Sequence, residues 1–304
     1  MKITIKHSIL VTFLLVSKSI FSQAEIIFNN VHFDESTSQV EQKLSLIATL
    51  DNKITVDKPT FPLASTQETH LIYSNIKTAN GTINKVAFTF SDNKLSYIQA
   101  NGNIYKTFVE KRKDTARAYM DYEVYVKDKL FIKEKEDVAW ILTSEGMHTG
   151  LFAWRNPYLN ENYSAKLNTG TNIPEFIEMG GALEVLKPIL ELNSEFTYIE
   201  KLDDSDPNAQ LQINCFGVDY LGFPRKIEAR FGNKKLNVVW ILTAKAEEDR
   251  IRQALINQYG KPIFVNDDWE IFSNWQVALR KDKPEVLLME QNIGLEYKSS
   301  YFKQ

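Results

Sequence analysis

The sequence predicts an α+β protein of two duplicated domains, each an antiparallel β-sheet with helices packed on one face. Three observations support this class: short runs in which polar and apolar residues alternate, turn residues between these runs, and a second half that repeats the order of the first. Alternation with period two is typical of a half-buried strand. Because the connections between the runs are short, neighbouring strands are expected to be antiparallel.

The N-terminal residues 1–24 have the pattern of a secretory signal peptide. Two lysines precede an apolar run over 9–16, and the residues at 22–24 fit a cleavage site, after Ala24 or two residues earlier. The apolar run is shorter than the roughly 20 residues that a membrane-spanning helix needs. We therefore expect an exported protein, periplasmic or secreted, without an integral membrane segment.

The composition restricts the classes of partner and the number of domains that we expect. Loss of 1–24 removes three lysines and no acidic residue, which changes the formal net charge from −3 to −6. An acidic surface disfavours nucleic acid and anionic membranes as partners. With 43% hydrophobic residues among 304, the chain can build two domains of ordinary size. Its single cysteine, Cys215, rules out an intramolecular disulfide.

The first domain is predicted over 25–154, in the order helix, strands, helix, strands. The first helix is expected over 36–50, with Asp34 or Ser36 as its N-cap. A second helix, basic on one side, is expected over 105–120. The predicted strands are 71–76, 84–90 and 94–99 before this helix, and 122–126, 130–133, 138–143 and 149–154 after it.

The second domain is predicted over 174–304, after a polar linker over 155–173. Its second helix is bounded best, because Gly260 and Pro262 follow the periodic residues and stop a helix. The remaining predicted elements are a helix over 176–192, a strand over 211–216, a hairpin over 226–242, the bounded helix over 245–259 and a strand over 285–288.

Self-comparison indicates that the two domains arose by duplication. With a shift of 141, the residues 85–95 fall on 226–236, and further on a shift of 135 places Trp140 on Trp275. The alternative is that any chain of antiparallel strands aligns loosely with itself.

The chain resembles exported bacterial proteins built from tandem repeats of a helix and an antiparallel sheet, of which the β-lactamase-inhibitor-protein-like fold is the best known. The resemblance rests on the hairpin 226–242, the helix end at 258–262, Trp275 and the strand 285–288. It implies that a sheet face and hairpin loops hold a protein or a small ligand, without catalysis. The first half departs from the pattern, because 119–122 replaces the glycine–proline stop.

The sequence shows no catalytic or metal-binding constellation. None of the four histidines has a histidine, cysteine or carboxylate partner at metal-ligand spacing, so we expect neither a metal nor a cofactor. His70 is expected to begin a strand, and His148 to lie in a hairpin turn. Cys215 is expected to be a small buried strand residue. The acidic run 203–206 precedes a proline and is interpreted as a solvated turn, with calcium binding as the alternative.

An apolar turn is the main candidate for binding. The turn before the second hairpin carries Tyr220, Leu221 and Phe223, whereas the matching turn 78–82 is polar. Exposed apolar groups at a hairpin tip indicate a docking site. The alternative is that they pack against the other domain or the linker. Trp269 follows a polar turn and is a further candidate for an exposed binding residue.

These observations favour an exported, non-enzymatic binding protein whose partner is a protein or an envelope component. One alternative is a hydrolase that acts on cell-envelope or polysaccharide material through paired carboxylates. Another is a carrier that holds a small molecule in a pocket between the repeats.

Overall fold

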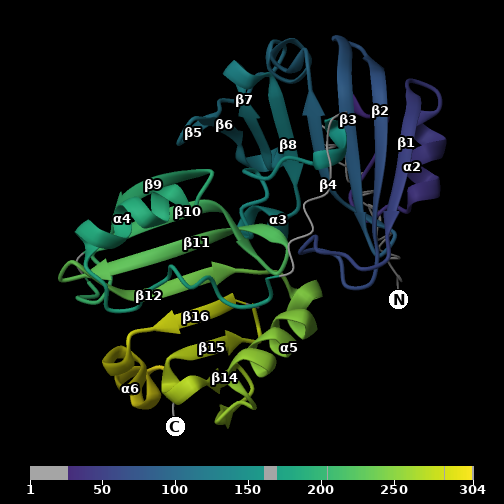
Figure 1. Ribbon diagram of the computed structural model, residues 1–304. Helices are drawn as coiled ribbons and strands as arrows, with labels where there is room; N and C mark the ends of the chain where they lie inside the picture. The colour runs from purple at the N-terminus through teal and green to yellow at the C-terminus, as the bar shows by residue number, and fades with distance from the viewer. Residues whose placement is uncertain (1–26, 161–169, 204, 284, 303–304) are drawn as a thin grey trace, which may run out of the picture.

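The computed structural model describes residues 27–160, 170–203, 205–283 and 285–302, and these form two antiparallel sheets of eight strands each (Figure 1). The strand order is β1-β2-β3-β4-β8-β7-β6-β5 in the first sheet and β9-β10-β11-β12-β16-β15-β14-β13, listed in the matching direction, in the second. The predicted α+β class with two duplicated halves is therefore confirmed. The predicted signal peptide lies outside the described residues.

In the described part of the first half, one sheet and two α-helices form. Its elements are α2 (Thr37–Leu44), β1 (Thr49–Val56), β2 (Glu68–Thr78), β3 (Gly81–Ser91), β4 (Lys94–Asn101), β5 (Arg117–Tyr119), β6 (Tyr122–Tyr125), β7 (Leu130–Lys133), β8 (Val138–Leu142) and α3 (Ser144–His148).

The second half repeats this order with longer helices. Its elements are α4 (Leu183–Leu192), β9 (Phe196–Lys201), β10 (Leu211–Tyr220), β11 (Phe223–Gly232), β12 (Lys235–Leu242), α5 (Glu248–Tyr259), β13 (Phe264–Val265), β14 (Trp269–Phe272), β15 (Val277–Arg280), β16 (Glu285–Met289) and α6 (Gln291–Ser300). Among the helices that the structure describes, none is long and apolar enough to cross a membrane.

The first predicted helix begins where expected but is shorter. Ser36 is its N-cap and forms a capping box with Gln39. The helix predicted over 36–50 ends at Leu44, and β1 follows at Thr49. Half of the eight residues of β1 are β-branched, which favours an extended chain over a helix.

The basic helix predicted over 105–120 is wrong. Only one π-helical turn forms over Tyr105–Val109, and the chain then continues to β5. The reason lies in Arg112, whose side chain is 3% exposed, donates to Asp128 at 2.6 Å and lies 4.1 Å from the ring centroid of Tyr125. An arginine that turns inward cannot occupy the solvent face of an amphipathic helix.

The strand predicted over 149–154 is also wrong. After β8 the chain forms the short helix α3, whose N-cap Thr143 accepts a hydrogen bond from Gly146. Gly150 then takes a left-handed φ of 78° and turns the chain. His148 is therefore the last residue of a helix and does not lie in a hairpin turn.

The helix predicted over 176–192 begins only at Leu183. Gly180 has a φ of 81°, a conformation that a helix cannot include. By contrast, the predicted helix over 245–259 is confirmed as a 3₁₀ turn followed by α5, and Gly260 ends it with a φ of 82°.

Strand register confirms the duplication and corrects one of its two shifts. Val86 pairs with Ala100 in the first sheet, and Ile227 pairs with Ile241 in the second, so the shift of 141 holds for the β3–β4 and β11–β12 hairpins. The shift of 135 is wrong. β4 pairs Tyr97 with Leu142, whereas β12 pairs Val238 with Met289, which gives 147 for β8 and β16.

Consequently Trp140 and Trp275 are not equivalent. Trp140 lies in β8, whereas Trp275 closes a 3₁₀ turn between β14 and β15.

Each sheet has one apolar core between itself and the helices that cover one of its faces. Leu186 and Leu190 of α4 belong to the second core, which also contains Ile213, Ala229 and Leu255. A third cluster, made largely of aromatic residues, joins the halves across the opposite faces of the sheets. Because successive strand residues point to opposite faces, the residues between these core positions in the second sheet face away from α4 and α5. Part of that opposite face is covered by α6, where Ile293 packs with Val238, Leu287 and Met289.

Candidate binding face

The face of the second sheet that points away from α4 and α5 carries a row of polar side chains. Cross-strand register places Gln212 opposite Arg230, and Asn214 opposite Glu228. Their neighbours Ile213 and Ala229 belong to the helix-side core, so the polar side chains lie on the other face. We call this row the charged face, and it consists of Glu200, Gln212, Asn214, Lys226, Glu228 and Arg230.

Glu228 is the centre of the row. Lys226 Nζ donates to one of its carboxylate oxygens at 2.8 Å, and Arg230 Nη2 donates to the other at 2.9 Å. Burial alone would raise the pKa of Glu228, but the charges of Lys226 and Arg230 and their hydrogen bonds outweigh it and lower this pKa. Glu228 is therefore held in its ionised form between two cations.

Hydrogen bonds continue the row toward β9. Arg230 Nε donates to Gln212 Oε1 at 2.8 Å, and Gln212 Nε2 donates to Asn214 Oδ1 at 2.8 Å. Asn214 Nδ2 then lies 3.4 Å from Glu200 Oε2. Gln212 and Asn214 are buried, whereas Glu200 is exposed and the side chain of Arg230 is 32% exposed. The row therefore runs from a covered centre to an accessible edge.

Aromatic side chains border the charged face. Tyr198 of β9 is 41% exposed and Tyr119 of β5 is 38% exposed. Burial, together with the charges of Glu200 and Glu228, raises the pKa of Tyr119, which shows that β5 of the first half lies beside this face. At the other side, the Arg230 guanidinium lies 6.0 Å from the ring of Trp240, within range of a cation–π interaction.

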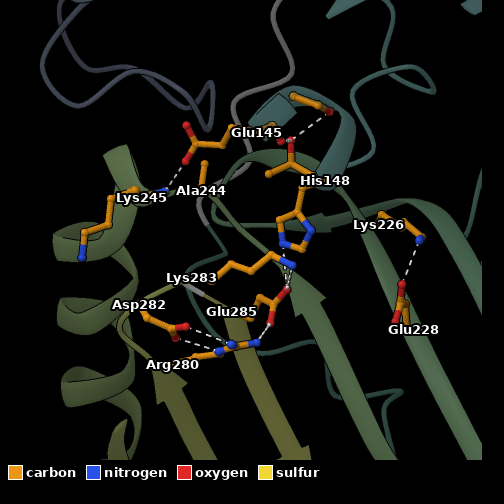
Figure 2. Close-up of polar contacts among 12 residues, drawn as sticks. Glu145, His148, Lys226, Glu228, Ala244, Lys245, Arg280, Asp282, Lys283 and Glu285 are labelled. Carbon is orange, nitrogen blue, oxygen red and sulfur yellow. Dashed lines mark hydrogen bonds and ion pairs between the residues drawn. The ribbon is translucent and has the colours of Figure 1, made fainter. Parts of the chain in front are cut away.

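A second polar group lies where the two halves meet (Figure 2). His148 Nε2, at the end of α3, is 2.7 Å from Glu285 Oε1 in β16, although the pair lacks the alignment of a hydrogen bond. Arg280 Nη1 and Lys283 Nζ lie 3.4 Å and 3.8 Å from the same carboxylate, and Arg280 also binds Asp282 through two hydrogen bonds. We call this group the seam cluster.

The equivalent face of the first sheet has different residues. The pair of Gln212 and Arg230 corresponds in register to the pair of His70 and Thr89. Glu228 corresponds to Ala87, since Asn214 pairs with the first and Ile72 with the second. The fold itself therefore does not require the charged row.

The first-half face is also closed by the chain that follows α3. Asn156 Nδ2 lies 2.9 Å from His70 Nδ1 and 3.0 Å from Thr89 Oγ1. The ring of Tyr158 lies 4.6 Å from the imidazole of His70, and the backbone of Asn156 donates to Gln99 Oε1 at 2.7 Å. His70 is only 1% exposed, so this polar group is an internal network and not an open site.

The apolar turn that the sequence singled out is covered. Tyr220 is 1% exposed and Phe223 is 4% exposed, while Leu221 is partly buried against the helix-side core. The Phe223 ring lies 6.0 Å from Phe61 and 5.4 Å from Trp154, both from the first half. This is the packing that the alternative interpretation expected, and it leaves these side chains little surface for a partner.

Trp269 is covered as well. It is 6% exposed and packs at 5.1 Å against Phe302, which follows α6. The polar turn before Trp269 predicted an exposed side chain. The covering contact was missed because α6, which leads to Phe302, could not be placed from the sequence.

The remaining sequence candidates have structural roles. Cys215 is fully buried, and burial raises the pKa of its thiol to about 11, as expected for an inert core cysteine. Asp203 caps its own turn by accepting from Ser205. Within the described part of the chain, no group of three or more histidine, cysteine or carboxylate side chains is placed to hold a metal.

Comparison with protein-family models, with curated proteins and with solved structures found no match for this chain.

Proposed function

We propose that this is an exported, non-enzymatic binding protein that recognises a protein partner through the charged face. The observation that supports the proposal is the difference between two copies of one fold. The first copy closes its sheet face with its own chain, whereas the second carries paired charges there, with Arg230 and Tyr198 accessible. Residues that folding does not require are candidates for function.

The chemistry of the charged face suits a protein partner. Arginine and tyrosine contribute strongly to protein interfaces, and rows of both charge signs give specificity more than raw affinity. The resemblance to tandem α+β repeat proteins that bind through a sheet face agrees with this proposal. An envelope component is the second candidate partner.

The two alternative functions have less support. A hydrolase needs a carboxyl group with a raised pKa as its general acid, but Glu228 has a lowered one. A carrier needs a pocket, and ligand pockets measure roughly 300–1,000 Å³. A cavity between the halves, lined by Trp154, Glu195 and Arg225 among others, has a volume of only about 10 Å³, room for about one water molecule.

The test compares how much cross-linked partner is recovered with the wild type and with the Arg230→Ala variant. The Arg252→Ala variant is the matched control. Arg252 is similarly exposed at 25% and also pairs with several carboxylates, but it lies on α5 at the other face of the sheet. We expect the wild type and Arg252→Ala to retain the partner, and Arg230→Ala to lose it. Equal recovery by both variants would refute the assignment of the face. Release of reducing ends or peptides from purified cell-wall material by the wild type would refute the non-enzymatic proposal.

A further inference from the structure

The duplication leaves four strands at the edges of the two sheets. Three of them are protected. β5 and β13 have three and two residues, which are too few to template another strand. β1 is longer, but its register is interrupted between Leu50 and Asn52, and it carries Asp51 and Lys53 in the middle. Charges and bulges of this kind prevent edge-to-edge pairing.

β9 is the exception. It pairs with β10 over six consecutive residues without interruption, and among the described strands it has no other partner. Its first four residues, 196–199, contain no charge and no proline. Tyr198 and Ile199 are 41% and 42% exposed on its two faces. The strand therefore offers a regular row of backbone groups with apolar side chains on both sides.

The repeat shows that this lack of protection is specific to the second copy. Lys53 of β1 pairs with Leu71, and Ile199 of β9 pairs with Ile213. Leu71 and Ile213 are equivalent, because they pair with residues 88 and 229, which differ by the shift of 141. Ile199 thus stands where the first copy has a lysine.

The surroundings of β9 select the charge of what could join it. The segment 191–206 carries six acidic residues and one lysine, and Glu191, Glu195 and Glu200 are exposed. Val185 and Leu192 of α4, which packs on β9, are 58% and 84% exposed. An added strand would meet apolar side chains along its length and negative charge at its ends.

We propose that β9 accepts an extended segment of a partner protein as a further antiparallel or parallel strand, and that this segment alternates apolar residues and has basic ends. Main-chain hydrogen bonds would provide the affinity, and side-chain alternation the specificity. The inference shares Glu200 with the charged face, but it concerns the backbone edge of β9 and would hold if Arg230 proved dispensable.

The experiment measures backbone hydrogen exchange of the full chain with and without a synthetic probe peptide. The peptide has nine residues: two lysines at each end and alternating valines and threonines between them. Addition of a strand should slow exchange within 196–201 by about tenfold or more. A peptide with glutamates in place of the lysines should protect at least tenfold less. No slowing within 196–201, or equal slowing by both peptides, would overturn the proposal.

Two variants locate the effect. Ile199→Lys gives β9 the residue that β1 tolerates at the same register position, so it should fold, and it should abolish protection by the probe. Ile263→Lys adds the same charge beside β13, at the opposite edge of the sheet, where Ile263 is 55% exposed, and should leave protection unchanged. A wild type that is dimeric by light scattering and becomes monomeric in Ile199→Lys would assign the edge to a second copy of this chain and overturn the proposal.

Discussion

Replacing Glu247 by glutamine should destabilise the protein far more than the same change at the surface. The side chain of Glu247 is fully buried, and Arg225, which is 2% exposed, donates to both of its oxygens at 2.5 Å and 2.8 Å. The backbone of Ala244 adds a third hydrogen bond at 2.9 Å. Arg250 lies 3.5 Å away and itself donates to the carbonyl of Phe61 in the first half.

The magnitude follows from what the change leaves behind. Glutamine keeps the shape but removes the charge, so the guanidinium of Arg225 stays buried without a counter-ion. Breaking a buried pair in this way costs about 3–5 kcal/mol. Replacement of both partners by apolar residues should cost less than either single change, because no buried charge then remains.

Urea unfolding followed by fluorescence measures the effect. The matched control is Glu191→Gln, which breaks the exposed pair with Lys187 at 3.8 Å, where the side chains are 43% and 45% exposed. Such pairs contribute about 0.2–1 kcal/mol. If Glu247→Gln lost no more stability than Glu191→Gln, the reasoning about the buried pair would be refuted.

Three further predictions concern single positions. Burial alone would raise the pKa of Asp92, but the hydrogen bonds that its carboxylate accepts from residues 65–67 outweigh burial and lower this pKa. The ionised Asp92 therefore stabilises the fold above about pH 4, and this stabilisation is lost as the pH falls toward the lowered pKa. Asp92→Asn should be less stable than the wild type at pH 7, and the difference in urea midpoint should shrink on acidification; a constant difference would contradict this. Cys215 should not react with a thiol reagent until the protein unfolds, because its thiol is buried with a pKa of about 11; rapid labelling of the native protein would be inconsistent with this. Gly217 has a φ of 80°, and a Cβ there would lie 2.4 Å from Glu195 Cγ, so Gly217→Ala should cost at least about 1–3 kcal/mol; an unchanged thermal midpoint would show that the strain is relieved.

Local chemistry predicted much of the fold. The hairpin between β3 and β4 turns at Asp92 and Asn93, both at positive φ, and its copy turns at Asn233 and Lys234 in the same way. Asparagine and aspartate tolerate this conformation, so both turns are visible in the sequence. Gly260 is visible as a helix stop for a similar reason.

The misplaced elements depend on contacts that sequence spacing does not show. The periodic basic residues after Tyr105 suggested a helix, but Arg112 is used as an internal ion partner of Asp128. β1 was missed because most of its residues are exposed, so it lacks the apolar alternation that identifies a strand.

The candidate site shows the same division. The alternation of Lys226, Glu228 and Arg230 is visible in the sequence, but Gln212 and Asn214 join the row only through strand pairing. Whether Phe223 is exposed depends on Trp154 of the other half, which no local pattern reveals.

The aromatic cluster between the halves has a consequence for how far each half can exist by itself. Phe152 lies 5.6 Å from Phe216 across this boundary, and Phe61 covers Phe223. A single repeat would present these rings to water, so each half depends on the other to cover this apolar face.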